Sequence, residues 1–189
     1  MKSISKTVLQ GATVALGLLL ASSGAAWDKD VKFSWAGTGW DTHVDNGPAG
    51  FGINLSMADV QGPFGAKRLV VSCEFSPPGG EDTEGVVCDD GYDMLLGVLY
   101  SAHTMTFENL DLLYANADTG WMCMSTTTGH YYGEIHGDYI GGTGRFLGAT
   151  GEWMTSFEGQ RLEPPFLNDV GFRSIHGEST GYIEFPMSD

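Results

Sequence analysis

The sequence predicts an all-β fold: a closed antiparallel β-barrel of about eight strands, preceded by an N-terminal signal helix. Segments in which apolar and polar residues alternate recur along the chain, and no segment after residue 26 combines a helix cap with a sustained 3.6-residue period. Glycine is abundant, with 28 of 189 residues. Several glycines lie inside predicted strands, such as Gly133, Gly137 and Gly177, where a closing sheet needs bends. A β-sandwich is the alternative architecture.

The first 26 residues have the features of a signal peptide. Lys2 and Lys6 give a positive start, residues 14–21 form a short apolar run, and residues 22–26 are small. The run is shorter than the roughly 20 apolar residues that span a bilayer, which disfavours an uncleaved anchor. We therefore expect residues 1–26 to be removed and residues 27–189 to form a single β-barrel domain, secreted or periplasmic.

Charge narrows the classes of partner. After removal of residues 1–26, the chain has seven basic and 24 acidic side chains, which gives a net charge of −17. Such a surface repels nucleic acid and anionic lipid. No later segment is long and apolar enough to suggest stable membrane insertion. The sequence implies no cofactor, and it leaves a homo-oligomer open.

The predicted strands follow one another with short connections. Glu108 and Asn109 suggest a hairpin turn, and the proline-containing segments 76–90 and 160–171 suggest loops over the barrel mouth or edge. We expect strands near residues 31–35, 50–59, 66–75, 92–108, 110–115, 121–125, 131–139, 151–157 and 172–185.

Three cysteines can form at most one internal disulfide. Alternation places Cys73 on one face with Val71 and Phe75, which predicts a buried and inert thiol. Cys88 lies in an acidic loop and Cys123 in a short apolar strand. We expect a Cys88–Cys123 disulfide, with Cys73–Cys88 as the alternative. No CxxC spacing indicates a zinc site.

A glycine cluster separates two strand-like runs near the C-terminal third of the chain. Its spacing is not that of a nucleotide-binding loop, and no helix follows it, so a strand-to-strand bend explains it better. Arg145 is then expected to snorkel or to pair with a carboxylate. The residues of this structural motif are Gly141, Gly142, Gly144, Arg145, Phe146, Gly148 and Gly151.

The segment YIGGTGRFLGATG, residues 139–151, resembles the GGTGRFxGATG signature of the allene oxide cyclase barrel and dirigent-like superfamily, especially an uncharacterised secreted bacterial branch. The likeness covers roughly residues 92–185. It implies a small eight-stranded antiparallel barrel with an apolar cavity. Some members cyclise a fatty-acid epoxide, some steer radical coupling and some close polyketide rings. No catalytic residue of that superfamily matches a position in this chain.

Three polar residues are the best candidates for proton transfer. His103 shares one face of its predicted strand with Leu95, Leu99 and Met105, so we expect it to face inward, where a histidine is usually a hydrogen-bonded core residue. Glu134 and His136 share one face of a strand with Tyr132 and Asp138. If that face points inward, they are candidates for acid–base work. The apolar Ile135 between them favours the outward interpretation.

These patterns predict a binding protein that holds a small hydrophobic or aromatic ligand in or near the barrel. A cofactor-independent cyclase or isomerase with His103, Glu134 and His136 in its cavity is the first alternative. A structural or oligomerising surface protein is the second.

Overall fold

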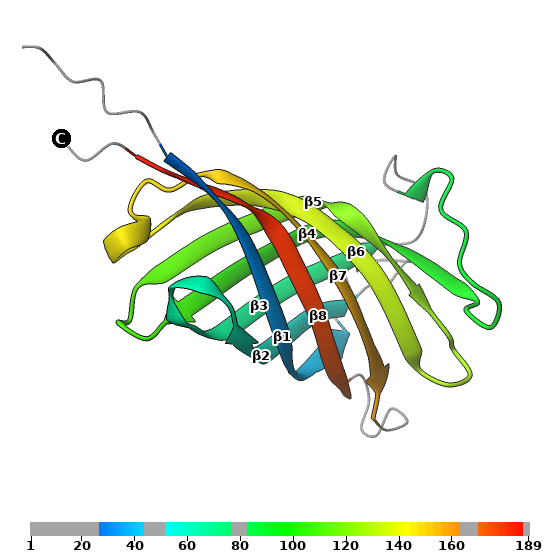
Figure 1. Cartoon of the computed structure of the whole chain (residues 1–189). Helices are drawn as coiled ribbons and strands as arrows, with labels where there is room; N and C mark the ends of the chain where they lie inside the picture. The colour runs from blue at the N-terminus through cyan, green and yellow to red at the C-terminus, as the bar shows by residue number, and fades with distance from the viewer. Residues whose placement is uncertain (1–26, 44–51, 77–82, 163–169, 187–189) are drawn as a thin grey trace, which may run out of the picture.

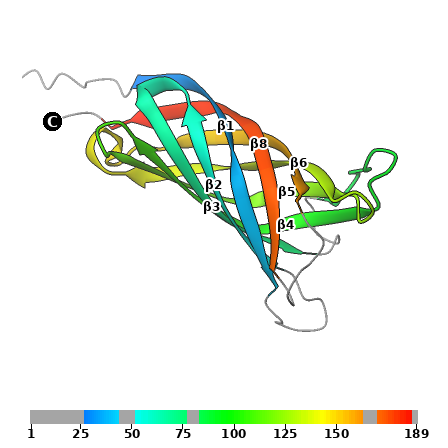
Figure 2. The ribbon, with the colours of Figure 1, turned by 90° about the horizontal axis from the view of Figure 1, so that it is seen from below.

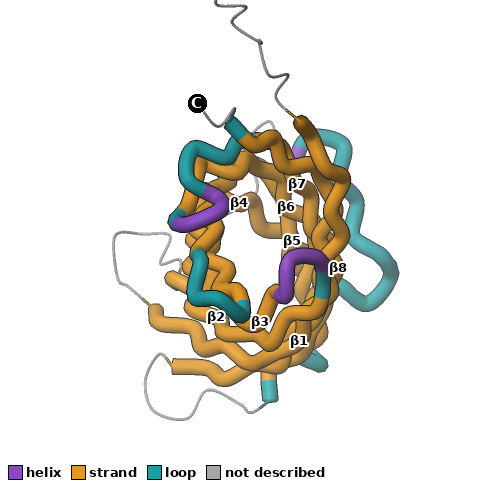
Figure 3. The backbone as a smooth tube through the Cα atoms, turned by 60° about the vertical axis from the view of Figure 1, so that its left-hand side comes forward, coloured by secondary structure: helices purple, strands orange, loops and turns teal. Residues whose placement is uncertain are grey.

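The computed structural model describes residues 27–43, 52–76, 83–162 and 170–186, and its strands form one closed barrel (Figures 1 and 3). Each strand pairs antiparallel with its neighbour in the chain, and β1 closes the ring against β8. A closed ring excludes the sandwich. The strands are β1 (Trp27–His43), β2 (Gly52–Gln61), β3 (Ala66–Ser76), β4 (Met94–Phe107), β5 (Leu112–Met124), β6 (His130–Gly142), β7 (Gly151–Arg161) and β8 (Val170–Phe185).

The prediction of a closed antiparallel barrel is confirmed, with two differences in its strands. Segments 110–115 and 121–125 belong to one strand, β5, because a register shift between Asn116 and Thr119 interrupts the alternation without ending the strand. β1 is longer than expected and spans Trp27–His43. The predicted signal helix lies outside the described residues.

Alternation along the strands divides the barrel into a packed inside and a polar outside. On β1, Val31, Phe33 and Trp35 are buried while Lys32 and Ser34 are exposed. The same period of two runs through β7, where the buried side chains are Trp153, Thr155 and Phe157. Burial of these large apolar side chains from every strand is what stabilises the closed sheet.

A bulge in β4 makes one prediction wrong, namely that Leu99 lies on the inner face of the barrel. The β3–β4 register shifts between Glu74 and Phe75, opposite Leu99. Leu99 is therefore 53% exposed, although simple alternation placed it beside His103 on the inner face. Buried positions resume at Ser101 and continue at Met105. One extra residue in a strand reverses the orientation of everything that follows it.

The glycine cluster forms the connection between β6 and β7, as predicted. β6 ends at Gly142, a single 3₁₀ turn, η3 (Gly144–Phe146), follows, and β7 begins at Gly151. Gly144 and Gly148 have φ of 56° and 72°, a region that favours glycine. The motif is thus a structural element that turns the chain at the barrel end.

An aromatic cluster fills that end of the barrel. It is the end at which β1 begins and β8 ends (Figures 1 and 2). Phe146 is fully buried, and its ring centroid lies 4.5 Å from that of Phe107 and 6.0 Å from that of Phe185. Phe64, in the 3₁₀ turn η1 (Pro63–Gly65), packs edge-on against Phe146 at 5.6 Å. Figure 3 shows these short turns at the near end of the ring. We call these four residues the phenylalanine plug.

Arg145 pairs with a carboxylate, one of the two roles expected for it. Its Nε donates to Oδ2 of Asp111 at 2.8 Å. Hydrogen bonds from Arg145 and Asn109 lower the pKa of Asp111. A Cβ on Gly144 would collide with the same Asp111 carboxylate. The motif is therefore joined to the turn between β4 and β5.

Candidate functional site

The barrel interior is almost completely filled. Between the inward side chains of the described residues lie two small hollows, of about 30 Å³ and 20 Å³, and His103 lines both. Ligand pockets typically measure about 300–1,000 Å³, whereas each hollow has room for about one or two water molecules. The described structure therefore offers no interior space for a hydrophobic ligand of ordinary size.

His103 faces inward, as predicted. Its Nε2 lies 2.7 Å from Oγ of Ser101, and its ring centroid is 4.5 Å from that of Trp153. The residue is partly buried and lines both hollows. Burial lowers the pKa of His103 to about 3, so the imidazole is neutral at ordinary pH.

Interior polar groups not identified from the sequence form a hydrogen-bonded chain. Nε1 of Trp35 donates to Oγ of Ser179 at 3.2 Å, and Ser179 donates to Oγ1 of Thr155 at 2.9 Å. Thr155 in turn donates to the carbonyl oxygen of Glu178 at 3.0 Å. Satisfied in this way, the groups hold three strands together. Buried Arg173 lies nearby, 5.0 Å from the ring of Tyr131, and burial lowers its pKa to about 9.

Glu134 and His136 point outward from β6, as the apolar Ile135 between them indicated. Oε1 of Glu134 lies 2.7 Å from Nε2 of His136. Ile135, between them, is buried. The structure therefore places this pair on the outer wall and His103 inside the barrel, and it does not bring the three residues into one pocket. Their catalytic role stays a prediction.

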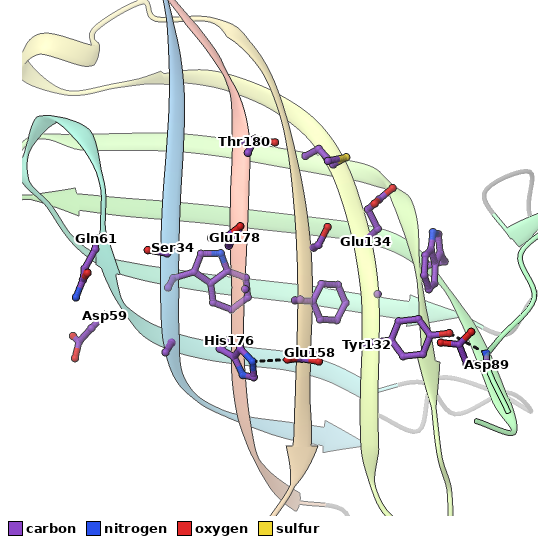
Figure 4. A pocket seen from close by; sticks show the side chains of 18 of the residues that line it. Ser34, Asp59, Gln61, Asp89, Tyr132, Glu134, Glu158, His176, Glu178 and Thr180 are labelled. Carbon is purple, nitrogen blue, oxygen red and sulfur yellow. Dashed lines mark hydrogen bonds and ion pairs between the residues drawn. The ribbon is translucent and has the colours of Figure 1, made fainter. Parts of the chain in front are cut away.

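A large open groove of about 1180 Å³ lies on the outer face of the barrel, lined by described residues (Figure 4). Its floor consists of outward residues of β1, β8 and β7, and we call it the outer groove. Asp59 and Gln61 of β2 border one side, and Trp121 of β5 and Tyr132 of β6 border the other. The polar strip Ser174, His176 and Glu178 of β8 contributes His176 and Glu178 to the floor.

An aromatic cluster forms one wall of the outer groove. The ring centroid of Tyr132 lies 4.8 Å from that of Tyr92 and 5.6 Å from that of Trp121, and both contacts are edge-to-face. Tyr132 and Trp121 are only partly buried. Sequence reasoning placed Tyr132 on the polar face of its strand but did not connect it with Tyr92 or Trp121, which lie on other elements.

The disulfide Cys88–Cys123 holds this wall in place. The structure forms the expected bond, and Cys73 is free and buried, with its pKa raised to about 12 by burial. Cys88 precedes Asp89, whose backbone N–H donates to Oη of Tyr132 at 3.0 Å. The disulfide thus fixes the segment that carries Asp89 and Tyr92 against the barrel.

The outer groove is acidic. Among the described residues that line it, five are acidic, His176 is the single histidine, and none is lysine or arginine. Oε1 of Glu158 lies 2.8 Å from Nε2 of His176 (Figure 4). Glu178 pairs with Lys32 at 2.8 Å. The five acidic residues are Asp59, Asp89, Glu134, Glu158 and Glu178.

The described residues contain no group of three or more His, Cys, Asp and Glu side chains placed to hold a metal ion. None of the helical turns in the described ranges has the length and apolar character to cross a bilayer. No protein-family model matches the chain, and no curated protein or solved structure matches it either. The resemblance to the allene oxide cyclase barrel and dirigent-like superfamily therefore stays a prediction.

Proposed function

We propose that the protein is an exported binding protein that takes a small hydrophobic or aromatic ligand in the outer groove. The contrast in volume carries this proposal: about 1180 Å³ in the outer groove against about 30 Å³ and 20 Å³ inside the barrel. Ligand sites are concave and combine aromatic surface with a few polar groups. The Cys88–Cys123 disulfide supports export, because such bonds persist in oxidising compartments.

The aromatic wall supplies the apolar contact. Tyr132 and Trp121 have restricted side chains, since each packs against a neighbouring ring. A flat ligand therefore stacks on them with little loss of side-chain entropy. Met154, 37% exposed on β7, adds adaptable apolar surface on the floor.

Titration with small aromatic compounds such as indole and p-cresol tests the proposal by calorimetry. Tyr132→Ala and Trp121→Ala should each weaken binding by about tenfold, the equivalent of about 1.4 kcal/mol. Tyr100→Ala is the matched control, because Tyr100 is 49% exposed on β4 and does not line the outer groove. Absence of binding, or equal loss in all three variants, would contradict the proposal.

The cyclase or isomerase alternative needs a substrate inside the barrel beside His103. The small interior hollows do not favour it, and it stays a prediction, as does the alternative of an oligomerising surface protein.

A further inference from the structure

We infer that the ligand of the outer groove is an organic cation, with an aromatic or apolar body and a positively charged amine or guanidine group. This inference rests on the proposed function, because it assigns the charge of the ligand that the same groove takes. It follows from the position of the carboxylates relative to the aromatic wall.

Three acidic residues are neighbours of Tyr132. Glu158 of β7 is its direct cross-strand partner on the outer face, and Glu134 is two residues along the same strand, on the same face. Asp89 lies at the hydroxyl end of the ring, through the bond from its backbone N–H to Oη (Figure 4). Direct cross-strand neighbours have Cβ atoms about 5 Å apart, and alternate residues along a strand are about 7 Å apart.

The second aromatic ring has a carboxylate neighbour as well. Trp121 of β5 pairs directly with Glu134 of β6. A cation that approaches the faces of Trp121 and Tyr132 therefore meets both the negative faces of the rings and a carboxylate. Tryptophan and tyrosine faces attract cations, most strongly when the site is partly desolvated.

Two other carboxylates of the groove, away from Tyr132, have basic partners. Lys32 pairs with Glu178, and Arg68 lies 3.8 Å from Asp59. Near Tyr132, Glu134 contacts His136 and Glu158 contacts His176. The aromatic end therefore has a negative potential that favours a cation and repels a carboxylate or phosphate ligand.

A series of compounds with one ring and different charge tests the inference. Benzylammonium, benzyl alcohol and benzoate are titrated by calorimetry at low and high salt. We expect benzylammonium to bind about tenfold or more tightly than benzyl alcohol, with benzoate weakest. The preference for the cation should shrink in high salt, because exposed charges are screened.

Two charge-neutralising variants locate the effect. Asp89→Asn and Glu134→Gln should each reduce the preference for benzylammonium over benzyl alcohol by about threefold or more, because each removes one carboxylate from the aromatic end of the groove. Glu74→Gln is the matched control, because it changes net charge equally from an exposed position on β3 outside the groove. An equal effect of Glu74→Gln would overturn the inference.

The outcomes separate the two proposals. Equal binding of benzylammonium and benzyl alcohol, lost in Tyr132→Ala, overturns the inference and leaves the proposed function standing. No binding of any ring compound overturns both. Binding of a neutral disaccharide such as cellobiose in place of every ring compound also overturns both, because it assigns the groove to another class of ligand.

Discussion

Cys88 is bonded to Cys123, and this bond fixes the segment that carries Tyr92 beside the strand that carries Trp121. The two cysteines are 35 positions apart. One covalent bond therefore serves both the stability of the barrel and the geometry of the aromatic wall, and it makes the proposed binding site sensitive to the redox state of the compartment.

The first prediction concerns this disulfide. The double variant Cys88→Ala and Cys123→Ala should lower the free energy of unfolding by about 3–4 kcal/mol, because the unfolded chain regains the entropy of a loop of that length. It should also weaken binding of aromatic compounds, since Tyr92 and Asp89 are no longer held against Tyr132. Equilibrium urea unfolding and calorimetry measure the two effects. A reductant should reproduce them in the original protein and change nothing in the double variant.

His103 should make stability depend on pH. Its pKa is about 3 in the folded protein and about 6.5 when unfolded. Above pH 6.5 both states are neutral, and as pH falls from 6.5 toward 3 only the unfolded state gains the proton. The free energy of unfolding should therefore fall by about 1.4 kcal/mol per pH unit in that range.

Replacement by a neutral residue isolates this effect. In His103→Gln this contribution to the pH dependence of the free energy of unfolding should disappear. The difference in free energy of unfolding between the variant and the original protein should therefore change with pH below 6.5 and be constant above it. NMR of the imidazole gives an independent measurement. A midpoint near 6.5 for His103 in the folded protein would contradict the prediction.

A substitution at Gly144 tests whether the close contact between the glycine motif and Asp111 contributes to stability. Gly144→Ala places a residue at φ 56° and drives its Cβ into the Asp111 carboxylate. Gly85→Ala is the control, because φ there is 77° and no atom lies within 4 Å of the new Cβ. In both variants the free energy of unfolding should fall by about 1 kcal/mol, because alanine is strained in the left-handed conformation. Gly144→Ala should lower the stability further than Gly85→Ala does, as measured by thermal or urea unfolding. Equal losses of stability would show that the Asp111 carboxylate moves aside without cost.

Phe146 tests the phenylalanine plug. Phe146→Ala removes a fully buried ring that contacts three other rings. It should lower the free energy of unfolding by about 3–5 kcal/mol. Leu147→Ala, at a neighbouring position that is 72% exposed, should change it by less than about 0.5 kcal/mol. Similar values for the two variants would mean that the plug does not contribute to stability.

The barrel and its main covalent link could be predicted because they depend on local patterns. Alternation at residues 131–139 and 151–157 predicts β6 and β7, and the glycines between them predict a strained connection. The acidic loop around Cys88 and the apolar strand around Cys123 favoured one disulfide. These features require only the periodicity of a strand and the conformational range of glycine.

The site could be predicted only in part, because it joins residues from elements far apart in the chain. Tyr92, Trp121 and Tyr132 come together through the closure of the sheet and the Cys88–Cys123 bond. No spacing in the sequence relates them. Leu99 shows a second limit of prediction from the sequence. The bulge that exposes Leu99 depends on how β4 pairs with β3, which alternation within β4 does not reveal.

By itself the sequence determined the class of fold, the alternating faces of each strand and the excess of negative charge, since each depends on residue type and local spacing. Only the tertiary structure decided that the interior is packed and that the groove lies outside, with acidic residues as neighbours of Tyr132. Alternation defines two faces of a strand, but the volume that one face encloses depends on how the side chains of all eight strands meet.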